Sequence, residues 1–260
     1  MPPAVDGAFA RWLADKAGAL LRDLRADRGY SDPEALRAAG DKYSHHLIAT
    51  ELARWRPGDE VFSEEAVSDV ARRVAADRVW IVDPLDGTRE FGEPGRTDWA
   101  VHIGLWARDS SAPFHLGAAA IALPAQHSVL GTDFPPGYPP MSPAAAAGGA
   151  LRLAVSRSRA PALVTALAEQ LHAELVPMGS AGAKIAAVIA GDADAYVHAG
   201  GQYEWDSAAP VAVASATGLH CSRIDGSALE YNRPDPFLPD LLVCRKDLAT
   251  RILNVLNAAH

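Results

Sequence analysis

The stretch VWIVDPLDGTREF, residues 79–91, decides the fold, because four apolar residues run directly into two aspartates. Four apolar residues in a row, bounded by turn residues, predict a buried strand. Asp-Pro and Asp-Gly are turn dipeptides, so Asp83 is expected at the end of the strand and Asp86 in the turn that follows. A simple turn explains the proline and the glycine, but it does not require two aspartates and a threonine beside them.

The spacing of the two aspartates excludes two familiar sites. An EF-hand loop needs oxygen ligands at alternate positions, and Leu85 occupies the place of the second ligand. A phosphatase with an aspartyl nucleophile in a DxDxT motif needs aspartates two residues apart, whereas these are three apart. A tight turn can direct both carboxylates and the Leu85 carbonyl at one point, which suits a hard divalent cation such as Mg²⁺. If a helix starts near Thr88, its free N–H groups point to the same place and can receive a phosphate.

The composition is that of an ordinary globular protein of 260 residues, enough for one large domain or two small ones that share an interface. Its net charge of −8 argues against binding to nucleic acid polymers or anionic membranes, which requires a basic surface. If the substrate is a small anion, something cationic must therefore lie in the site.

The cysteines and the start of the chain indicate a cytoplasmic location. Cys221 and Cys244 lack CxxC or zinc-type spacing, so two reduced thiols are expected rather than a disulfide. The first dozen residues carry charges and no apolar run approaches about 18 residues, so the sequence predicts no signal peptide and no membrane span.

The first half of the chain predicts helices followed by strands, the order of an α+β fold. Apolar residues recur at helical spacing from Val5 to Leu24, and SDPE at 31–34 is a helix-start signal for a second helix that ends near Trp55. Strands are then expected at 61–62, 79–82, 99–105, 116–123 and 128–132.

The composition changes at FPPGYPPMSPAAAAGGA, residues 134–150, which has too few bulky side chains to pack a core. This segment is expected to connect an α+β domain, residues 1–140, to an α/β domain, residues 150–260. In the second half, strands and helices alternate as in an α/β layer. The expected strands are 151–155, 175–177 and 195–198, and the expected helices are 161–173, one after GSAG at 179–182 and one after Trp205.

Further acidic residues suited to a metal site are spread along the chain. FSEEA places Glu64 and Glu65 at the end of a short strand, WDSAAP places Asp206 at a helix start, and AAGDKYS contains Asp41. Read singly, Asp41 and Asp206 fit ordinary helix caps or solvated charges. Together with the aspartates of the turn they form an ordered set.

This set resembles the motifs of the inositol monophosphatase superfamily, the Mg²⁺-dependent, lithium-sensitive sugar and nucleotide phosphatases. The motifs are Asp41, Glu64–Glu65, DPLDGT at 83–88 and WDSAAP at 205–210, and the likeness continues through 179–197 and 225–232. Two departures are small: Gly40 precedes the first aspartate, and Ala208–Ala209 replace the usual Gly-Gly. The resemblance implies an α/β protein with a layered αβαβα sandwich and a metal site in the cleft between the halves.

The resemblance also implies two Mg²⁺ ions, with room for a third near Glu64 and Glu65. The first ion would be bound by Glu64, Asp83 and the Leu85 carbonyl. The second would be bound by Asp83, Asp86 and Asp206.

In the same family pattern, a water activated by the metals attacks the phosphate in line. Thr88 and Glu64 would orient this water, and Asp41 would orient other waters of the metal site. The residues expected to contact the substrate are Glu64, Asp86, Gly87, Thr88, Arg89, Lys184 and Asp206.

Within the superfamily, DGTREF and GSAGAK resemble the 3′(2′),5′-bisphosphate nucleotidase branch, enzymes of sulfur metabolism. The expected reaction removes the 3′-phosphate of adenosine 3′,5′-bisphosphate, or of its sulfated analogue. Lys184 and Arg89 are candidates for the second phosphate, and His198 fits either the base pocket or a structural role.

Three alternatives remain open at this point. The chain could be an inositol monophosphatase or a fructose-1,6-bisphosphatase, because the metal chemistry is the same and only the pocket differs. It could also be a regulatory or binding protein on the same fold, although the intact acidic set argues against loss of activity. The expected partner is a small phosphorylated molecule, and a homodimer is compatible with the resemblance.

Overall fold

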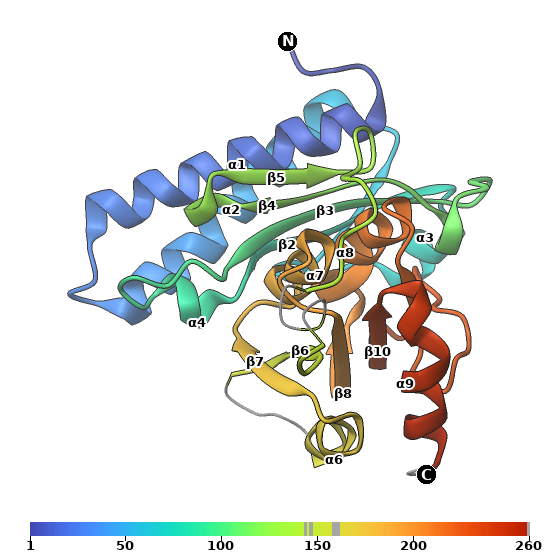
Figure 1. Ribbon diagram of the computed structural model, residues 1–260. Helices are drawn as coiled ribbons and strands as arrows, with labels where there is room; N and C mark the ends of the chain where they lie inside the picture. The colour runs from blue at the N-terminus through green and yellow to red at the C-terminus, as the bar shows by residue number, and fades with distance from the viewer. Residues whose placement is uncertain (143–144, 146–147, 158–161, 259–260) are drawn as a thin grey trace.

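Two five-stranded sheets form the framework of the computed structural model, which describes residues 1–142, 145, 148–157 and 162–258 (Figure 1). The first sheet has the order β1-β2-β3-β4-β5, with β1 and β2 parallel and the other pairs antiparallel. Its strands are β1 (Glu60–Ser63), β2 (Arg78–Asp86), β3 (Ala100–Ala107), β4 (Leu116–Leu123) and β5 (Ser128–Gly131). All five strands predicted for the first half are confirmed.

The second sheet has the order β7-β6-β8-β10-β9. Strands β7, β6 and β8 are parallel, and β10 and β9 continue the sheet in antiparallel fashion. The strands are β6 (Arg152–Ser156), β7 (Glu174–Met178), β8 (Ala195–Tyr203), β9 (His220–Ser222) and β10 (Phe237–Cys244). The parallel part is the α/β layer that the alternating pattern predicted.

The long helices lie in three layers around the two sheets (Figure 1). One pair covers the outer face of the first sheet, a second pair lies between the sheets, and a third pair covers the outer face of the second sheet. In that order the pairs are α1 (Asp6–Arg28) with α2 (Pro33–Trp55), α7 (Ala181–Ala190) with α8 (Glu204–Ala216), and α6 (Ala162–Leu171) with α9 (Lys246–Ala258). The expected αβαβα sandwich is confirmed.

Strand β2 is buried on both faces because helices cover both sides of its sheet. Val79 and Ile81 pack in the core between the sheets, whereas Trp80 and Val82 pack beneath α1 and α2. This alternation explains why the strand reads as a continuous apolar run rather than as alternating apolar and polar residues. The end of β2 therefore carries Asp83 into the interior, where its side chain is 1 % exposed.

Small residues allow α8 to lie close to the first sheet. A Cβ added to Gly104 of β3 would lie 3.2 Å from the backbone nitrogen of Ala209, and Ala208 and Ala209 are fully buried. Alanine at these two positions therefore fits the close approach. The packing brings the first turn of α8, with Asp206, toward the end of β2.

Among the described residues, the elements not predicted from the sequence include α3 (Val70–Ala75), β9, β10, α9 and two short 3-10 helices, Pro113–His115 and Pro124–Gln126. Strand β10 contains a proline, and its register shifts between Leu238 and Asp240, which weakened the strand pattern. The start of the predicted helix 161–173 and part of the 134–150 segment lie outside the described residues. The division into domains at that segment stays a prediction.

Two smaller expectations can be compared with the structure. Cys221 and Cys244 are both free thiols, as predicted. Among the described residues, no helix combines the length and the apolar character needed to cross a membrane.

Asp194 anchors the end of the connecting segment to the second sheet. Its fully buried carboxylate accepts hydrogen bonds from the Ser142 backbone at 3.0 Å, from the Ser142 hydroxyl at 2.6 Å and from the Arg152 backbone at 2.8 Å.

We expect Asp194→Ala to lower the free energy of unfolding in urea by about 3 kcal/mol or more, because buried donors lose their acceptor. The exposed neighbour is the control: Asp192→Ala should change it by less than about 0.5 kcal/mol. Equal effects would contradict the anchoring role.

Candidate metal and phosphate site

The DPLD segment, residues 83–86 at the end of β2, is held by hydrogen bonds within the segment and from α2. The Leu85 backbone N–H donates a hydrogen bond to Asp83 Oδ1 at 3.0 Å, and the buried Ser44 hydroxyl of α2 donates to the Pro84 carbonyl at 2.7 Å. The pairing of β2 with β3 shifts register between Asp83 and Asp86. Strand β2 therefore does not end at Asp83 as expected: it bulges within the DPLD segment and pairs with β3 again at Asp86, opposite Ala100. Both aspartates remain buried.

Gly87 completes the turn for two physical reasons. Its φ of +81° lies in the left-handed region, which favours glycine. A Cβ at this position would also lie 3.1 Å from both the Asp98 carbonyl oxygen and the Ser180 Cβ. The helix that follows, α4 (Thr88–Phe91), is a single turn. The expectation that its N–H groups bind a phosphate stays a prediction.

Thr88 and Asp41 meet on the α2 side of the turn. The Thr88 hydroxyl lies 3.0 Å from the Leu85 carbonyl oxygen and 3.3 Å from Asp41 Oδ1, so its proton is directed at protein acceptors. Burial and the nearby charge of Glu65 raise the pKa of Asp41 to about 6, although the Thr88 hydroxyl opposes the shift. Because the hydroxyl proton of Thr88 is donated to these protein acceptors, the Thr88 oxygen is free to accept a hydrogen bond from a water.

The carboxylates at the end of β2 resist ionisation. Burial, with repulsion from Asp86 and Glu64, raises the pKa of Asp83 well above its ordinary value. Loss of hydration and repulsion from Asp206 raise the pKa of Glu64 to about 7, although one side of Glu64 remains exposed. Burial and repulsion from Asp86 raise the pKa of Asp206 to about 7.

This electrostatic conflict fits a divalent metal. The donors are carboxylate and carbonyl oxygens, the ligands that Mg²⁺ prefers, and a cation among them would remove the repulsion that raises their pKa values. The residues present therefore fit a metal site.

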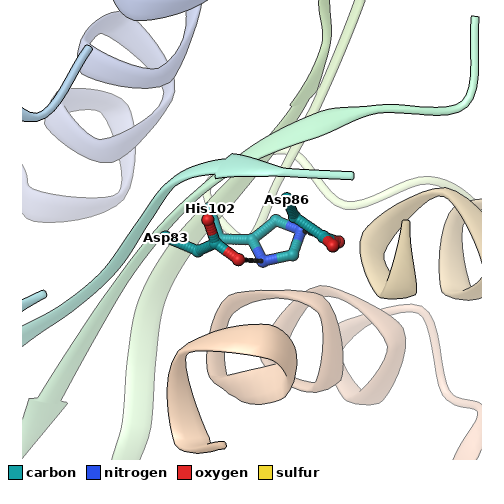
Figure 2. A group of neighbouring side chains, drawn as sticks. All are labelled: Asp83, Asp86 and His102. Atoms are coloured by element: carbon teal, nitrogen blue, oxygen red, sulfur yellow. Dashed lines mark ion pairs between the residues drawn. The ribbon is translucent and has the colours of Figure 1, made fainter. Parts of the chain in front are cut away.

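His102 lies between the two aspartates of the turn and was missed in the sequence (Figure 2). Its Nε2 lies 3.2 Å from Asp86 Oδ2 and its Nδ1 3.9 Å from Asp83 Oδ2. The Nδ1 is also 3.1 Å from the Trp205 carbonyl oxygen, and since a carbonyl can only accept, Nδ1 donates there. The fully buried imidazole thus ties β3 to the first turn of α8 through Nδ1, while its Nε2 faces Asp86 without a hydrogen-bond partner among the described residues. A lone polar residue in the apolar strand WAVHIGLW was the signal that could have found it.

Asp86 joins the two halves of the chain. Its Oδ2 accepts hydrogen bonds from the Ser180 hydroxyl at 2.5 Å and from the Gly182 backbone at 2.7 Å. Ser180 is also the N-cap of α7, where its hydroxyl accepts from the Ala183 backbone. Gly182 must be a glycine because a Cβ there would collide with His102 Nε2. The GSAG segment is therefore the part of the second half that holds the acidic turn.

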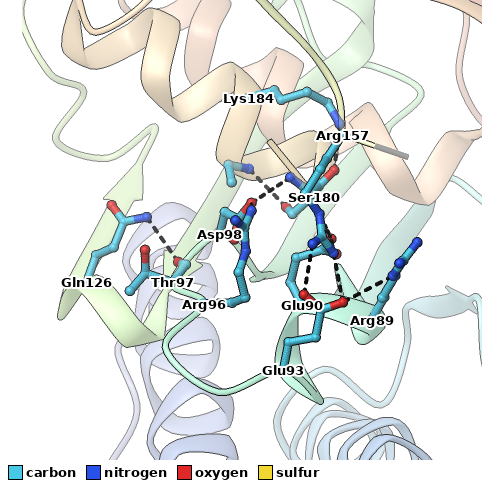
Figure 3. Close-up of polar contacts among 12 residues, drawn as sticks. Arg89, Glu90, Glu93, Arg96, Thr97, Asp98, Gln126, Arg157, Ser180 and Lys184 are labelled. Atoms are coloured by element: carbon cyan, nitrogen blue, oxygen red, sulfur yellow. Dashed lines mark hydrogen bonds and ion pairs between the residues drawn. The ribbon is translucent and has the colours of Figure 1, made fainter. Parts of the chain in front are cut away.

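Charged side chains connect the same segments from outside the turn (Figure 3). Arg157, which follows β6, makes ion pairs with Glu90 and Glu93 at 2.7 Å and 2.9 Å. Asp98 pairs with Arg96 and accepts a hydrogen bond from the Gly179 backbone at 2.6 Å. These contacts hold the α4 turn against the loop that precedes α7.

The two cations proposed for a second phosphate differ in their surroundings. Lys184 is only 3 % exposed, donates from Nζ to the Gly179 carbonyl at 2.6 Å and lies 5.1 Å from the centre of the Tyr196 ring. Burial lowers the pKa of Lys184, while the charges of Asp86, Glu90 and Asp206 oppose that shift. Arg89 lies on the surface beside the turn and pairs with Glu93 at 3.2 Å. Lys184 is thus a buried charge that feels the nearby carboxylates of Asp86 and Asp206, not a solvated one.

The structure brings most of the predicted site residues together. Hydrogen bonds join Asp41, Thr88 and the Leu85 carbonyl. Asp83 and Asp86 lie with His102 in one close, buried group, and the charges of Glu64 and Asp206 act on Asp83 from nearby. Their assigned roles in metal binding, catalysis and substrate binding stay predictions.

Comparisons with known proteins agree with this geometry. The model of the inositol monophosphatase family matches residues 7–259. A 3′-phosphoadenosine 5′-phosphate phosphatase of Mycobacterium tuberculosis is 52 % identical over 92 % of this chain and 89 % of its own. The 3′(2′),5′-bisphosphate nucleotidase CysQ of Escherichia coli is 29 % identical over 77 % of this chain and 81 % of its own. The crystal structure of inositol monophosphatase-II from Staphylococcus aureus shares the fold, with a TM-score of 0.74, 19 % identity and coverage of 97 % and 93 %.

The raised pKa values predict a pH-dependent effect of Mg²⁺ on stability. A carboxyl group whose pKa is raised by folding stabilises the metal-free protein below its ordinary pKa, near 4, and this contribution is lost as pH rises through about 7. Metal binding requires ionised carboxylates, so bound Mg²⁺ should offset this loss of stability over the same pH range. We expect saturating Mg²⁺ to raise the Tm by about 5 °C more at about pH 8 than at about pH 5. Thermal scans against NaCl of equal ionic strength test this, and equal shifts at both pH values would contradict it.

Proposed function

The chain belongs to the inositol monophosphatase family, and from this premise we propose that it hydrolyses the 3′-phosphate of adenosine 3′,5′-bisphosphate to give AMP. We propose that the sulfated analogue, 3′-phosphoadenosine 5′-phosphosulfate, is hydrolysed in the same way. The mycobacterial relatives named as phosphatases of this nucleotide support the substrate. The observation that carries the class of reaction is the intact acidic cluster at the end of β2, which fits divalent cations.

We assign the acidic residues to two Mg²⁺ ions. Glu64, Asp83 and the Leu85 carbonyl would hold the first ion, and Asp83, Asp86 and Asp206 would hold the second. Glu64 and Glu65 leave room for a third ion. When bound, the ions would neutralise the phosphate charge and lower the pKa of a nearby water. An acidic protein can thereby bind a polyanion, which answers the charge conflict posed by the net charge of −8.

The side chains of the α2 side are suited to orient the attacking water. The Thr88 hydroxyl is held by the Leu85 carbonyl and Asp41, so its oxygen can accept a hydrogen bond from a water at a defined place. Glu64 lies at the open edge of the cluster and can accept a second hydrogen bond from the same water. A water fixed by two acceptors loses little further entropy before it attacks the phosphorus in line.

Inositol monophosphate and fructose 1,6-bisphosphate remain the alternative substrates, because the metal chemistry would be unchanged. The likeness to the inositol monophosphatase structure concerns the fold alone at 19 % identity. Lithium sensitivity and a cytoplasmic location are parts of the proposal. The rival of a non-catalytic protein on this fold is weakened because Asp41, Glu64, Asp83, Asp86, Thr88 and Asp206 are all present.

Phosphate release from a panel of substrates tests the proposed function. We expect turnover of adenosine 3′,5′-bisphosphate to exceed that of inositol 1-phosphate and fructose 1,6-bisphosphate, to require Mg²⁺, and to fall with millimolar Li⁺ but not with Na⁺. Asp83→Asn should abolish turnover while the protein stays folded, because it removes a ligand shared by both ions and also relieves repulsion in the metal-free cluster. Activity without Mg²⁺, or retained activity in a folded Asp83→Asn protein, would contradict the two-metal assignment.

Selectivity for a bisphosphate should depend on Lys184. The buried ammonium lies within the field of Asp86 and Asp206, so it is the cation that we propose attracts the second phosphate of a bound substrate. Lys184→Met keeps the volume and removes the charge, so it should lower kcat/KM for adenosine 3′,5′-bisphosphate roughly ten- to a hundredfold and leave a simple monophosphate nearly unchanged.

Arg89→Ala is the matched test of the competing cation. If only Arg89→Ala separates the two substrates, the selectivity belongs to the catalytic turn. If Lys184→Met depresses both substrates equally, Lys184 is structural or contacts the reacting phosphate.

A further inference from the structure

Two aromatic rings remain exposed beside the acidic cluster. Tyr203 and Phe237 are 46 % and 47 % exposed, and their rings meet edge to face with centroids 6.2 Å apart. The Tyr203 backbone N–H donates a hydrogen bond to Asp206 Oδ2 at 2.6 Å, so the tyrosine adjoins one of the carboxylates that fit a metal. Exposed aromatic rings occur elsewhere on the surface too, but this pair lies beside Asp206 and offers its apolar faces to a molecule bound there.

The Tyr203 ring is the outermost member of a supported row of aromatic rings. It stacks on Trp205 at 4.8 Å with the planes 16° apart, and Trp205 contacts the edge of Phe62 at 5.2 Å. The Arg73 guanidinium lies 4.1 Å from the centre of the Phe62 ring and is fixed by Asn232 at 2.8 Å. The row therefore begins in the core and holds Tyr203 in place before any ligand arrives.

The Phe237 ring is given room by a glycine turn. A Cβ at Gly201 would lie 2.5 Å from the Phe237 ring, and Gly200 and Gly201 have φ values of +133° and +86°. The His198 Nε2 lies 2.9 Å from the Gly201 carbonyl, and its Nδ1 lies 3.2 Å from the Tyr196 hydroxyl. His198, a candidate for the base pocket, thus supports the turn beneath Phe237.

The layers of the fold decide which part of a substrate reaches these rings. Thr88 and Asp41, which are suited to orient the attacking water, lie on the α2 side of the first sheet. Asp206 and Tyr203 belong to the start of α8, on the opposite face of that sheet. In an in-line displacement the leaving oxygen departs opposite the attacking water, so the body of the substrate must extend toward α8.

We propose that Tyr203 and Phe237 form the platform on which the base of the nucleotide substrate stacks, an inference that rests on the proposed function. The metals and the protein groups that bind the reacting phosphate cannot distinguish a nucleoside from another alcohol. An aromatic face, in contrast, recognises a purine ring by stacking. A neutral base is also the part of the substrate that an acidic protein can bind without a cation. The pair therefore determines preference for nucleotides over other phosphate esters.

Steady-state kinetics with a matched pair of substrates test the platform. One is adenosine 3′,5′-bisphosphate, and the other is the analogue in which hydrogen replaces the base. We expect Tyr203→Ala to raise KM for the nucleotide about five- to a hundredfold with little change in kcat, because stacking is equally strong in the ground and transition states. KM for the baseless analogue should not change. Tyr203→Phe, which keeps the ring, should behave as the unchanged protein, and Phe237→Leu should have a smaller effect of the same kind.

A distant aromatic residue supplies the control. Phe134 is 78 % exposed on the far side of β5, and Phe134→Ala should leave both substrates unaffected. If Tyr203→Ala raises KM equally for both substrates, Tyr203 acts through Asp206. If it raises KM for neither substrate, the base binds elsewhere. Either result overturns the platform. A changed sedimentation coefficient with unchanged kinetics would assign the rings to a contact between copies and overturn it too. Failure of the unaltered protein to hydrolyse the nucleotide would instead overturn the proposed function.

Discussion

The crowding of carboxylates at the end of one buried strand is the constraint on which the rest of the structure depends. Helices cover both faces of the sheet that β2 belongs to, so burial together with the charges of Asp86 and Glu64 raises the pKa of Asp83. The cluster makes sense as a place where a divalent cation completes the structure.

The same carboxylates explain how the halves of the chain are joined. Asp86 comes from the first half, yet Ser180 and Gly182 of the second half supply two of its hydrogen bonds. His102 adds a link from β3 to the first turn of α8, beside Asp206. Each half therefore lacks part of the site, and the packing of α7 and α8 between the sheets is what assembles it.

The fold and the acidic residues could be predicted from the sequence because each has a local signal. The apolar run before DPLDGT marks a strand buried on both faces, and Asp32 before Pro33 marks the start of α2. His102 was missed because its position depends on β3 bringing it between Asp86 of β2 and Trp205 of α8. The burial of Lys184 was missed for a related reason: sequence spacing places a lysine on α7, but only the packing shows that Gly179 and Tyr196 enclose its ammonium group.

Chemistry and selectivity are assigned to different kinds of residue in this molecule. Asp83 and Asp86 are buried, and hydrogen bonds from Leu85, Ser180 and Gly182 fix their carboxylates, so the positions of these two groups are set by the fold. The rings of Tyr203 and Phe237 are exposed, and their neighbours are glycines and other rings rather than hydrogen-bonding groups. A rim of this kind can vary while the metal site stays the same, which is how one fold serves phosphatases with different substrates.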